Sequence, residues 1–382
     1  MSDDVGQLLW VGFQGTTVPS ELAKQLSAGT YGASILFKRN LAISTIGGRG
    51  RGGGDGDGAV TQEVCDLDAL VALNRGLHLA APDGTPALIA IDQEGGLVQR
   101  VRAPATMWPP MMAHDGLAAP LDTETAEQIG RAIGDELRAL GLDLDFAPIL
   151  DVHTNPANPI IGDRAFGHDA TTVTRRALAF ARGLDAAGIL ACGKHFPGHG
   201  DTDTDSHLAL PLIDHDWARL EAVELAPFKA AAAANLPMIM TAHVVFAALD
   251  AQCPATLSEQ VITGLLRQRL GYRGVIVSDD LDMKAIAAHM GVDEAAVGAI
   301  RAGCDVILLC CNEDNQRLAV EGLTKAAERD SELRRRIGES AARVRAMKLA
   351  HAANQAKHPT PSREVVGSFE HRRLADRLAG RA

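Results

Sequence analysis

The sequence predicts a single-domain (β/α)8 barrel. Short apolar runs alternate with helical patterns roughly eight times along the 382 residues. The apolar runs are continuous, as expected for parallel strands that are buried on both faces. Polar residues follow one run after another, at the end of each expected strand: Asp92, Asp151, Lys194, His195, His243 and Asp279. A barrel gathers such ends around one mouth, whereas a doubly wound open sheet, the alternative, would spread them along an edge.

The apolar runs and the helical patterns define the expected elements. Strands are expected at 8–12, 33–37 and 87–91, within 142–149, and at 190–193, 237–241, 274–278 and 305–309. Helices are expected at 20–27, 67–80, 123–140, 171–187, 217–234, 258–270, 294–302, 315–329 and 331–353. The helix at 123–140 has the clearest helical period of apolar residues. Ser258 is a suitable N-cap for the helix that starts there.

Two segments stand apart from this alternation. Residues 47–58, with the sequence GGRGRGGGDGDG, offer no apolar side chains to bury and are expected to form a flexible insert. The arginines of this insert have no aromatic neighbours, so an RNA-binding role is not expected. We expect the barrel to span residues 1–350 and residues 351–382 to form a helical, polar tail on its outside.

The composition of the chain limits which partners and which cellular compartment we expect. The chain is 46% hydrophobic and 22% charged, with a formal net charge of -11. This charge argues against nucleic acid or an anionic membrane as the main partner. Asp3 and Asp4 stand where a signal peptide needs positive charge, and we expect no membrane span. The six cysteines lack metal-ligand spacing and suit reduced thiols. We therefore expect a cytoplasmic protein, a monomer or weak dimer.

One stretch, KHFPGHGDTDTDSHLALP at 194–211, concentrates the ionisable groups. It holds three histidines, three aspartates and a lysine, and its prolines and glycines prevent a regular helix. The aspartates resemble the start of a calcium loop, but Ser206 and Leu212 stand where that loop needs glycine and glutamate. A zinc hydrolase of the barrel type would need a histidine pair of the HxH or HExxH kind, which the sequence lacks. We expect no metal.

Asp205 and His207 suit acid–base chemistry. Their spacing lets an extended segment place both side chains on one side, so that the carboxylate orients the imidazole and raises its pKa toward neutrality. Asp279 follows a buried strand and is either a nucleophile or the N-cap of the next helix. Together the three residues would support a two-step covalent displacement. Retaining glycoside hydrolysis works in this way, usually with two carboxylates.

Seven motifs resemble the β-N-acetylhexosaminidases of glycoside hydrolase family 3, of the single-domain bacterial NagZ type that recycles peptidoglycan fragments of the cell wall. The motifs follow the family's order over about residues 8–345. They are GASILFKRN at 32–40, IDQEGG at 91–96 with VQR at 98–100, FAPILD at 146–151, IGDRAF at 161–166, the whole stretch 194–211, MTAH at 240–243 and VSDDLDM at 277–283. The histidine dyad in 194–211 distinguishes this branch from the related β-glucosidases.

The resemblance implies a role for each matching residue. Asp279 would be the nucleophile and His207 the acid/base, oriented by Asp205. The positions that bind the terminal sugar match Asp92, Arg100, Arg164, Lys194 and His195. His243 would lie near the nucleophile, and His199 would shape the turn rather than catalyse. The family implies no metal or organic cofactor and a retaining exo-β-N-acetylglucosaminidase that acts on peptidoglycan fragments or chito-oligosaccharides.

Other functions stay open at this point. Two alternatives come from the same family: a β-glucosidase and an N-acetylglucosaminide phosphorylase. The phosphorylase stays open because a neutral imidazole would not repel a phosphate acceptor. A metal-dependent barrel hydrolase and a sugar-binding protein without catalysis are further alternatives. Leu97 departs from the family pattern, which has arginine there, and should affect only an outer contact. The insert at 47–58 is expected on the active-site side of the barrel.

Overall fold

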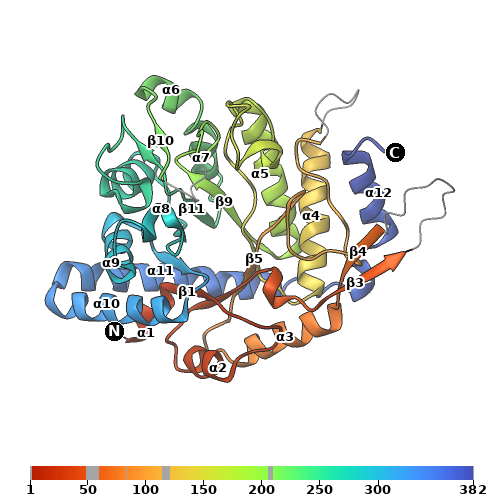
Figure 1. Cartoon of the computed structure of the whole chain (residues 1–382), viewed down its shortest axis with the longest axis horizontal. Helices are drawn as coiled ribbons and strands as arrows, with labels where there is room; N and C mark the ends of the chain where they lie inside the picture. The colour runs from red at the N-terminus through yellow and green to blue at the C-terminus, as the bar shows by residue number, and fades with distance from the viewer. Residues whose placement is uncertain (1, 49–59, 83, 114–120, 205–209, 382) are drawn as a thin grey trace.

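The computed structural model describes residues 2–48, 60–82, 84–113, 121–204 and 210–381, and its centre is a closed barrel of eight parallel strands (Figure 1). The strands are β1 (Leu9–Gly12), β2 (Ala33–Leu36), β5 (Ile89–Ile91), β8 (Leu144–Asp145), β9 (Leu190–Phe196), β11 (Met238–Thr241), β13 (Val275–Asp280) and β14 (Val306–Leu309). They are neighbours in chain order, and β14 closes the ring against β1 with Leu9 opposite Ile307. The predicted fold class is confirmed.

Helices surround the barrel. They are α1 (Ser2–Gln7), α2 (Ser20–Ser27), α3 (Leu67–Leu79), α4 (Thr123–Ala139), α5 (Ala170–Ala187), α6 (Trp217–Ala222), α7 (Ala226–Ala233), α8 (Lys284–Ala287), α9 (Val292–Ala302), α10 (Glu313–Arg329), α11 (Ser331–Gln355) and α12 (Phe369–Leu378). A π-helix, Gln260–Arg269, follows Ser258, whose hydroxyl accepts the N–H of Val261 as an N-cap does. Among the described residues, no helix is both long and apolar enough to cross a membrane.

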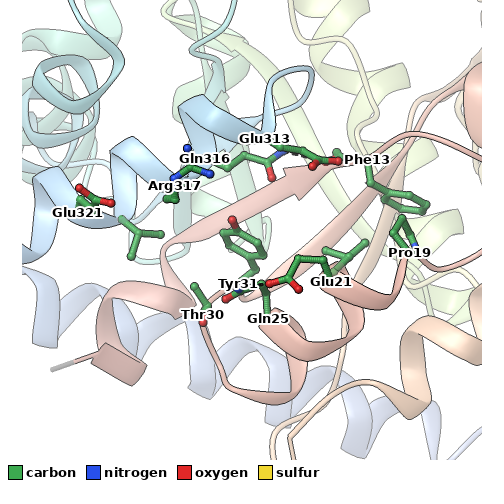
Figure 2. A pocket seen from close by; sticks show the side chains of 13 residues that line it. Phe13, Pro19, Glu21, Gln25, Thr30, Tyr31, Glu313, Gln316, Arg317 and Glu321 are labelled. Carbon is green, nitrogen blue, oxygen red and sulfur yellow. Dashed lines mark hydrogen bonds between the residues drawn. The ribbon is translucent and has the colours of Figure 1, made fainter.

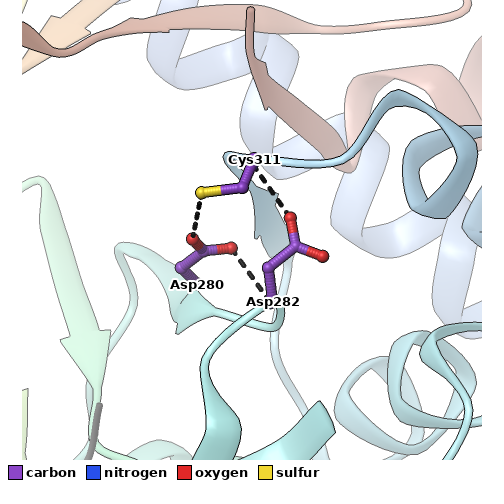
Figure 3. Close-up of side chains that lie close together, drawn as sticks. All are labelled: Asp280, Asp282 and Cys311. Carbon is purple, nitrogen blue, oxygen red and sulfur yellow. Dashed lines mark hydrogen bonds between the residues drawn. The ribbon is translucent and has the colours of Figure 1, made fainter.

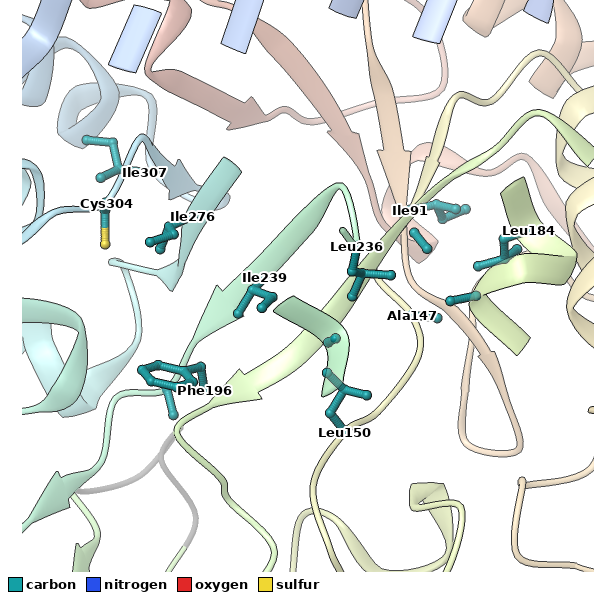
Figure 4. Close-up of a cluster of buried hydrophobic side chains, with 14 of the residues drawn as sticks. Ile91, Ala147, Leu150, Leu184, Phe196, Leu236, Ile239, Ile276, Cys304 and Ile307 are labelled. Carbon is teal, nitrogen blue, oxygen red and sulfur yellow. The ribbon is translucent and has the colours of Figure 1, made fainter. Parts of the chain in front are cut away.

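The strands bury side chains on both faces, in strict alternation. Ile91, Ile239, Ile276 and Ile307 point outward and pack under the helices, and Figure 4 shows Ile91 near Leu184 of α5. The inward-facing residues fill the barrel, and they include Ala90, Cys192, Met240, Val277 and Leu308. Burial on both faces explains why the strands read as continuous apolar runs.

Two expected elements differ from the structure. Strand β9 continues to Phe196, three residues beyond the expected end at 193, because it reaches into the mouth of the barrel. The single helix expected at 217–234 is two helices, α6 and α7. Pro227, at the start of α7, has no N–H to donate to a preceding turn, so one helix cannot continue through it.

A β-hairpin that the sequence analysis did not predict flanks the glycine-rich insert. Strands β3 (Ile43–Gly48) and β4 (Val60–Cys65) pair in antiparallel register outside the barrel (Figure 1). Of the expected insert at 47–58, residues 47 and 48 belong to β3, and the rest lies outside the described residues. Lys38, which follows β2, donates to Glu63 of β4 at 2.7 Å, so the hairpin lies beside the end of β2.

The C-terminal residues pack against the outside of α4. Leu374, Ala375 and Leu378 of α12 are buried. Glu136 of α4 accepts hydrogen bonds from the backbone N–H of Gly367 at 3.0 Å and from Nδ1 of His371 at 2.9 Å. Helix α11 runs across residue 350, and a domain boundary there stays a prediction.

Candidate active site

The polar residues at the strand ends surround one cavity in the mouth of the barrel. Its volume is about 390 Å3. Of the residues predicted for the site, those that line it are Asp92, Arg100, Arg164, Lys194, His195, His199 and Asp279. Apolar side chains, among them Phe37, Phe146 and Met240, share the remaining wall with Arg39, Asp280 and Cys311. A mostly apolar pocket with a few convergent polar groups is the usual form of a small-molecule site.

Strand alternation places the charged groups in this cavity. Each lies two positions after an inward-facing core residue of a barrel strand: Lys194 after Cys192 in β9, Asp279 after Val277 in β13, and Asp92, which directly follows β5, after Ala90. Because successive side chains of a strand point to opposite faces, these three continue the inward row beyond the apolar core. The site is therefore the top layer of the barrel interior.

Five charged side chains form one continuous network at the edge of the cavity. Asp92 accepts from Lys194 Nζ at 2.7 Å and from Arg100 Nη2 at 3.1 Å. Glu94 lies 2.6 Å from Lys194 Nζ. It also accepts from Nε and Nη2 of Arg164, both at 2.9 Å. Cations and anions thus alternate from Arg100 to Arg164, so each buried charge has an opposite partner.

The network keeps its members ionised. Burial alone would raise the carboxyl pKa values, but Lys194 and Arg100 hold the pKa of Asp92 well below its ordinary range. Arg164 and Lys194 likewise lower the pKa of Glu94 against the effect of burial. Burial would lower the pKa of Lys194, and the charges of Asp92 and Glu94 raise it instead. These side chains are fixed charges at neutral pH.

Asp151 anchors the start of the histidine-rich segment. Its carboxylate contacts Nδ1 of His195 at 2.7 Å and accepts the backbone N–H groups of His195 at 3.1 Å and of His199 at 2.7 Å. The turn also packs tightly, since a Cβ at Gly200 would lie 1.8 Å from the carbonyl oxygen of Val152. Asp151 therefore braces the barrel mouth, the role that the residue's place at a strand end suggested for it.

His199 is buried and bonds within its own turn. Its Nδ1 lies 2.8 Å from the hydroxyl of Thr202. Burial, together with the charge of the neighbouring His195, lowers the pKa of His199 to about 4. A neutral imidazole held in this way suits the predicted turn-shaping role better than proton transfer near neutral pH.

Asp279 is ionised at the end of β13. Burial opposes its charge, but His195, His243 and a hydrogen bond from the Asp280 N–H lower the pKa of Asp279 below its ordinary value. That N–H donates to Asp279 Oδ1 at 2.8 Å. His243 is 2.8 Å from the hydroxyl of Thr256 and 3.1 Å from the backbone carbonyl of Asp280, so it lies directly beside the aspartate pair. An anion at this place can act as a nucleophile.

Asp205 and His207 lie outside the described residues. The described flanks of their segment are tied down. Asp201 accepts the hydroxyl of Thr154 at 2.7 Å and pairs with Nε2 of His215. Strand β10 (Leu212–Ile213) then pairs with β12 (Val245–Phe246). Asp201, which made the segment resemble a cation loop, is thus part of an anchor.

Asp280, Asp282 and Cys311 form a cluster (Figure 3), and Asp280 and Cys311 also line the cavity. Asp280 accepts the N–H groups of Asp282 and Cys310, both at 3.1 Å. Asp282 accepts the Cys311 N–H at 2.9 Å and the side chain of Asn315 at 2.6 Å. These bonds join the end of β13 to the end of β14, and they account for the cluster as a structural connection.

A second hollow, of about 240 Å3, lies between α2 and α10 on the outside of the barrel (Figure 2). Figure 2 shows Tyr31 at its centre, below Gln316 and Arg317. Gln316 donates to the carbonyl oxygens of Gly12 at 2.8 Å and Leu309 at 3.0 Å, so it joins β1 to β14. None of the residues that we predicted for the active site lines this hollow.

Sequence reasoning missed two residues of the IDQEGG turn. Gln93 accepts the N–H groups of Arg100 at 2.9 Å and Val101 at 3.0 Å, which places Arg100 against Asp92. Glu94 joins Lys194 to Arg164. Glu94 is two positions after Asp92, and in an extended segment the two side chains point to the same side. This spacing could have indicated that Glu94 lies near the site. Leu97, in contrast, is 82% exposed, as expected for an outer position.

The ionised carboxylates should make folding sensitive to acid. The pKa values of Asp92, Glu94, Asp151 and Asp279 are lowered in the folded protein, so the unfolded chain binds more protons as the pH falls. Their contribution to stability is complete above about pH 5 and is lost as the pH drops through about 4 and below. We expect urea unfolding to show this loss, and Asp92→Asn to show a shallower one. An unchanged pH dependence in Asp92→Asn would contradict the charge assignment.

Comparisons with known proteins agree on one family. A family model described as the glycosyl hydrolase family 3 N terminal domain matches residues 1–347. A beta-hexosaminidase of Bordetella parapertussis is 38% identical over 307 residues, which cover 78% of each protein. Beta-hexosaminidase A of Pseudoalteromonas piscicida is 34% identical over 386 residues and matches 95% of this chain, but the chain spans only 60% of that protein.

Solved structures give the same result. A glycoside hydrolase family 3 beta-N-acetylglucosaminidase from Paenibacillus sp. str. FPU-7 has a TM-score of 0.86 and 40% identity, covering 99% of this chain and 68% of its own. NagZ from Neisseria gonorrhoeae, in complex with N-trifluoroacetyl-D-glucosamine, has a TM-score of 0.75 and 31% identity, covering 98% of both chains. The chain described here belongs to glycosyl hydrolase family 3.

Proposed function

We propose that this protein is a retaining exo-β-N-acetylglucosaminidase that releases terminal, non-reducing β-linked N-acetylglucosamine from peptidoglycan fragments or chito-oligosaccharides. The observation that carries the proposal is the ionised Asp279, which lines the same cavity as the Asp92–Lys194 ion pair. The names of the similar proteins, beta-hexosaminidase and beta-N-acetylglucosaminidase, support this substrate.

The ion network supplies the contacts to the sugar. Both oxygens of Asp92 keep a lone pair beyond those that accept from Lys194 and Arg100, and they can take sugar hydroxyls. Arg164 gives two of its five N–H donors to Glu94 and one to the carbonyl of Ile160, which leaves two for the ligand. His195 lines the same cavity, and Asp151 fixes its ring. A fixed set of donors and acceptors of this kind selects one orientation of the sugar.

The proposed reaction has two steps. Asp279 attacks the anomeric carbon and forms a glycosyl ester, while His207, as imidazolium, gives its proton to the departing oxygen. The neutral His207 then takes a proton from water, which attacks the same carbon and releases Asp279. Two inversions give net retention. Asp205 would hold His207 in the correct tautomer. The low pKa of Asp279 supports its role, because an attacking carboxylate must be charged.

The remaining expectations stay predictions. We propose a cytoplasmic protein that is a monomer or weak dimer, needs neither a metal nor an organic cofactor, and has no nucleic acid or membrane partner. The free, mostly buried cysteines support the location.

A paired assay tests the proposed substrate. We expect an aryl β-N-acetylglucosaminide to be hydrolysed with a kcat/KM at least about 100-fold above that of the matching aryl β-glucoside. Equal or reversed rates would identify a β-glucosidase. The same assay in phosphate buffer should give free sugar; formation of sugar 1-phosphate would favour the phosphorylase. Loss of activity with a chelator would favour the metal-dependent hydrolase.

Replacing the nucleophile tests the mechanism. We expect Asp279→Ala to lower kcat for the aryl N-acetylglucosaminide on the order of 10⁴-fold, since the covalent route is lost. Asp280→Asn is the matched control. Burial and the neighbouring Asp282 raise the pKa of Asp280 to about 7, so a neutral amide is a small change there. Near wild-type turnover by Asp279→Ala, or equal losses in both variants, would remove Asp279 from the role.

The acid role of His207 has its own signature. A general acid matters most when the leaving group is a weak one. We therefore expect His207→Ala to reduce the first step strongly for substrates with poor leaving groups, such as alkyl or sugar aglycones, and much less for nitrophenyl ones. A series of aryl substrates with graded phenol pKa values measures this dependence. Equal losses across the series would contradict the acid role.

A further inference from the structure

We propose that Glu94 is a positioning residue that holds Lys194 and Arg164 in place as ligands of the sugar. The proposal rests on the function proposed above. Glu94 does not line the cavity, whereas Lys194 and Arg164 do. Any effect of Glu94 on substrate must therefore pass through these two cations, and the contacts among the three residues define how.

The contacts of Glu94 fix both cations at once. Its Oε1 is 2.6 Å from Lys194 Nζ and accepts from Arg164 Nη2 at 2.9 Å, while its Oε2 accepts from Arg164 Nε at 2.9 Å. Two parallel bonds to a carboxylate set the plane of a guanidinium as well as its position. The direction of the remaining N–H donors of Arg164 is fixed as a result.

Glu94 also balances a local excess of positive charge. The side chains of Lys194 and Arg164 are 3% and 13% exposed, so water screens them little. Arg164 lowers the pKa of Lys194, as burial does, and the charges of Asp92 and Glu94 together outweigh both. Without the Glu94 charge, Lys194 would depend on Asp92 alone and would repel Arg164. Its pKa would then fall, and the two cations would separate.

The backbone presents Glu94 rigidly. It lies in strand β6 (Gln93–Gly95), which forms a tight hairpin with β7 (Val98–Gln99). Gly95 has a φ of 96°, and a Cβ there would lie 2.7 Å from the carbonyl oxygen of Pro109, so only glycine fits the turn. Arg164 comes from a short 3-10 helix (Gly162–Arg164) and Lys194 from β9. Glu94 thus connects three separate segments of the chain.

Glu94→Gln tests the proposal because it removes the charge and keeps the shape. We expect kcat/KM for the aryl N-acetylglucosaminide to fall roughly 10- to 100-fold, mainly through a higher KM. The acid His207 sets the alkaline limb of the pH–kcat/KM profile, and the lowered pKa of Lys194 in the variant should add the loss of a second proton, so that the limb becomes steeper and moves to lower pH. Glu94→Asp keeps the charge on a shorter side chain, and we expect a raised KM with an unmoved alkaline limb.

Asp305→Asn is the matched control. Asp305 is a buried carboxylate shared by arginines, since it pairs with Arg267 and Arg343 and accepts from Ser340 at 2.9 Å. It directly precedes β14, at the opposite end of the barrel from the cavity. We expect this variant to unfold at a lower temperature or urea concentration but to keep the wild-type KM and pH profile.

The outcomes separate the two proposals. Failure of the wild-type protein to hydrolyse the substrate would reject the proposed function. With an active wild type, a Glu94→Gln variant that loses only stability, with KM and the alkaline limb unchanged as in Asp305→Asn, would overturn the positioning role. If Glu94→Gln does not fold, Glu94→Asp decides: a wild-type KM in that variant overturns the proposal, and a raised KM with an unmoved alkaline limb supports it.

Discussion

In a closed barrel of parallel strands, the C-terminal ends of all strands lie at the same mouth, and the site depends on this constraint. Asp92, Lys194 and Asp279 stand at the ends of β5, β9 and β13 and span almost 200 positions of the chain. They share a single cavity because the ring brings these strand ends together (Figure 1). The period of two along each strand then decides which side chains face inward. Ala90, Cys192 and Val277 fill the barrel. The next inward positions carry the charges of the site.

Those charges are tolerable in the mouth because they are paired. A lone ammonium or carboxylate would lose its charge if it were buried there. The chain from Arg100 through Lys194 to Arg164 instead alternates in sign, and each link is a direct contact of 2.6 to 3.1 Å. The network thereby supplies fixed, oriented donors and acceptors, which need little rearrangement when a sugar binds. We regard this pre-organisation as the main contribution of the fold to the proposed activity.

The hydrophobic pattern predicted much of the fold and of the site. Continuous apolar runs and the polar residue after each run were sufficient to predict the barrel and the convergence of Asp92, Lys194 and Asp279. The hairpin around the insert was missed because its strands lie outside the barrel and lack an apolar run. The break before Pro227 was missed because the apolar pattern continues across it.

The sequence did not predict which side chains from distant segments of the chain contact one another. In the sequence, Glu94 is only one residue of a turn. Its pairing with both Arg164 and Lys194 is known only from the structure, which places these two residues beside it. Asp151 was likewise noticed as a strand-end residue, but its bonds to His195 and His199 depend on how a later segment folds back onto it. Strand parity identifies which residues face inward, and it does not identify their partners.

In the proposed reaction, Asp279 forms a covalent bond to the sugar. The protein is incubated with a fluorinated N-acetylglucosaminyl fluoride whose ester with the enzyme hydrolyses slowly. Peptide mass spectrometry then detects the covalent bond directly. We expect one added fluorosugar on the peptide that contains Asp279, with fragmentation that assigns it to that residue, and none in Asp279→Ala. An adduct on another residue, or steady turnover of this reagent without any adduct and with inversion at the anomeric carbon, would contradict it.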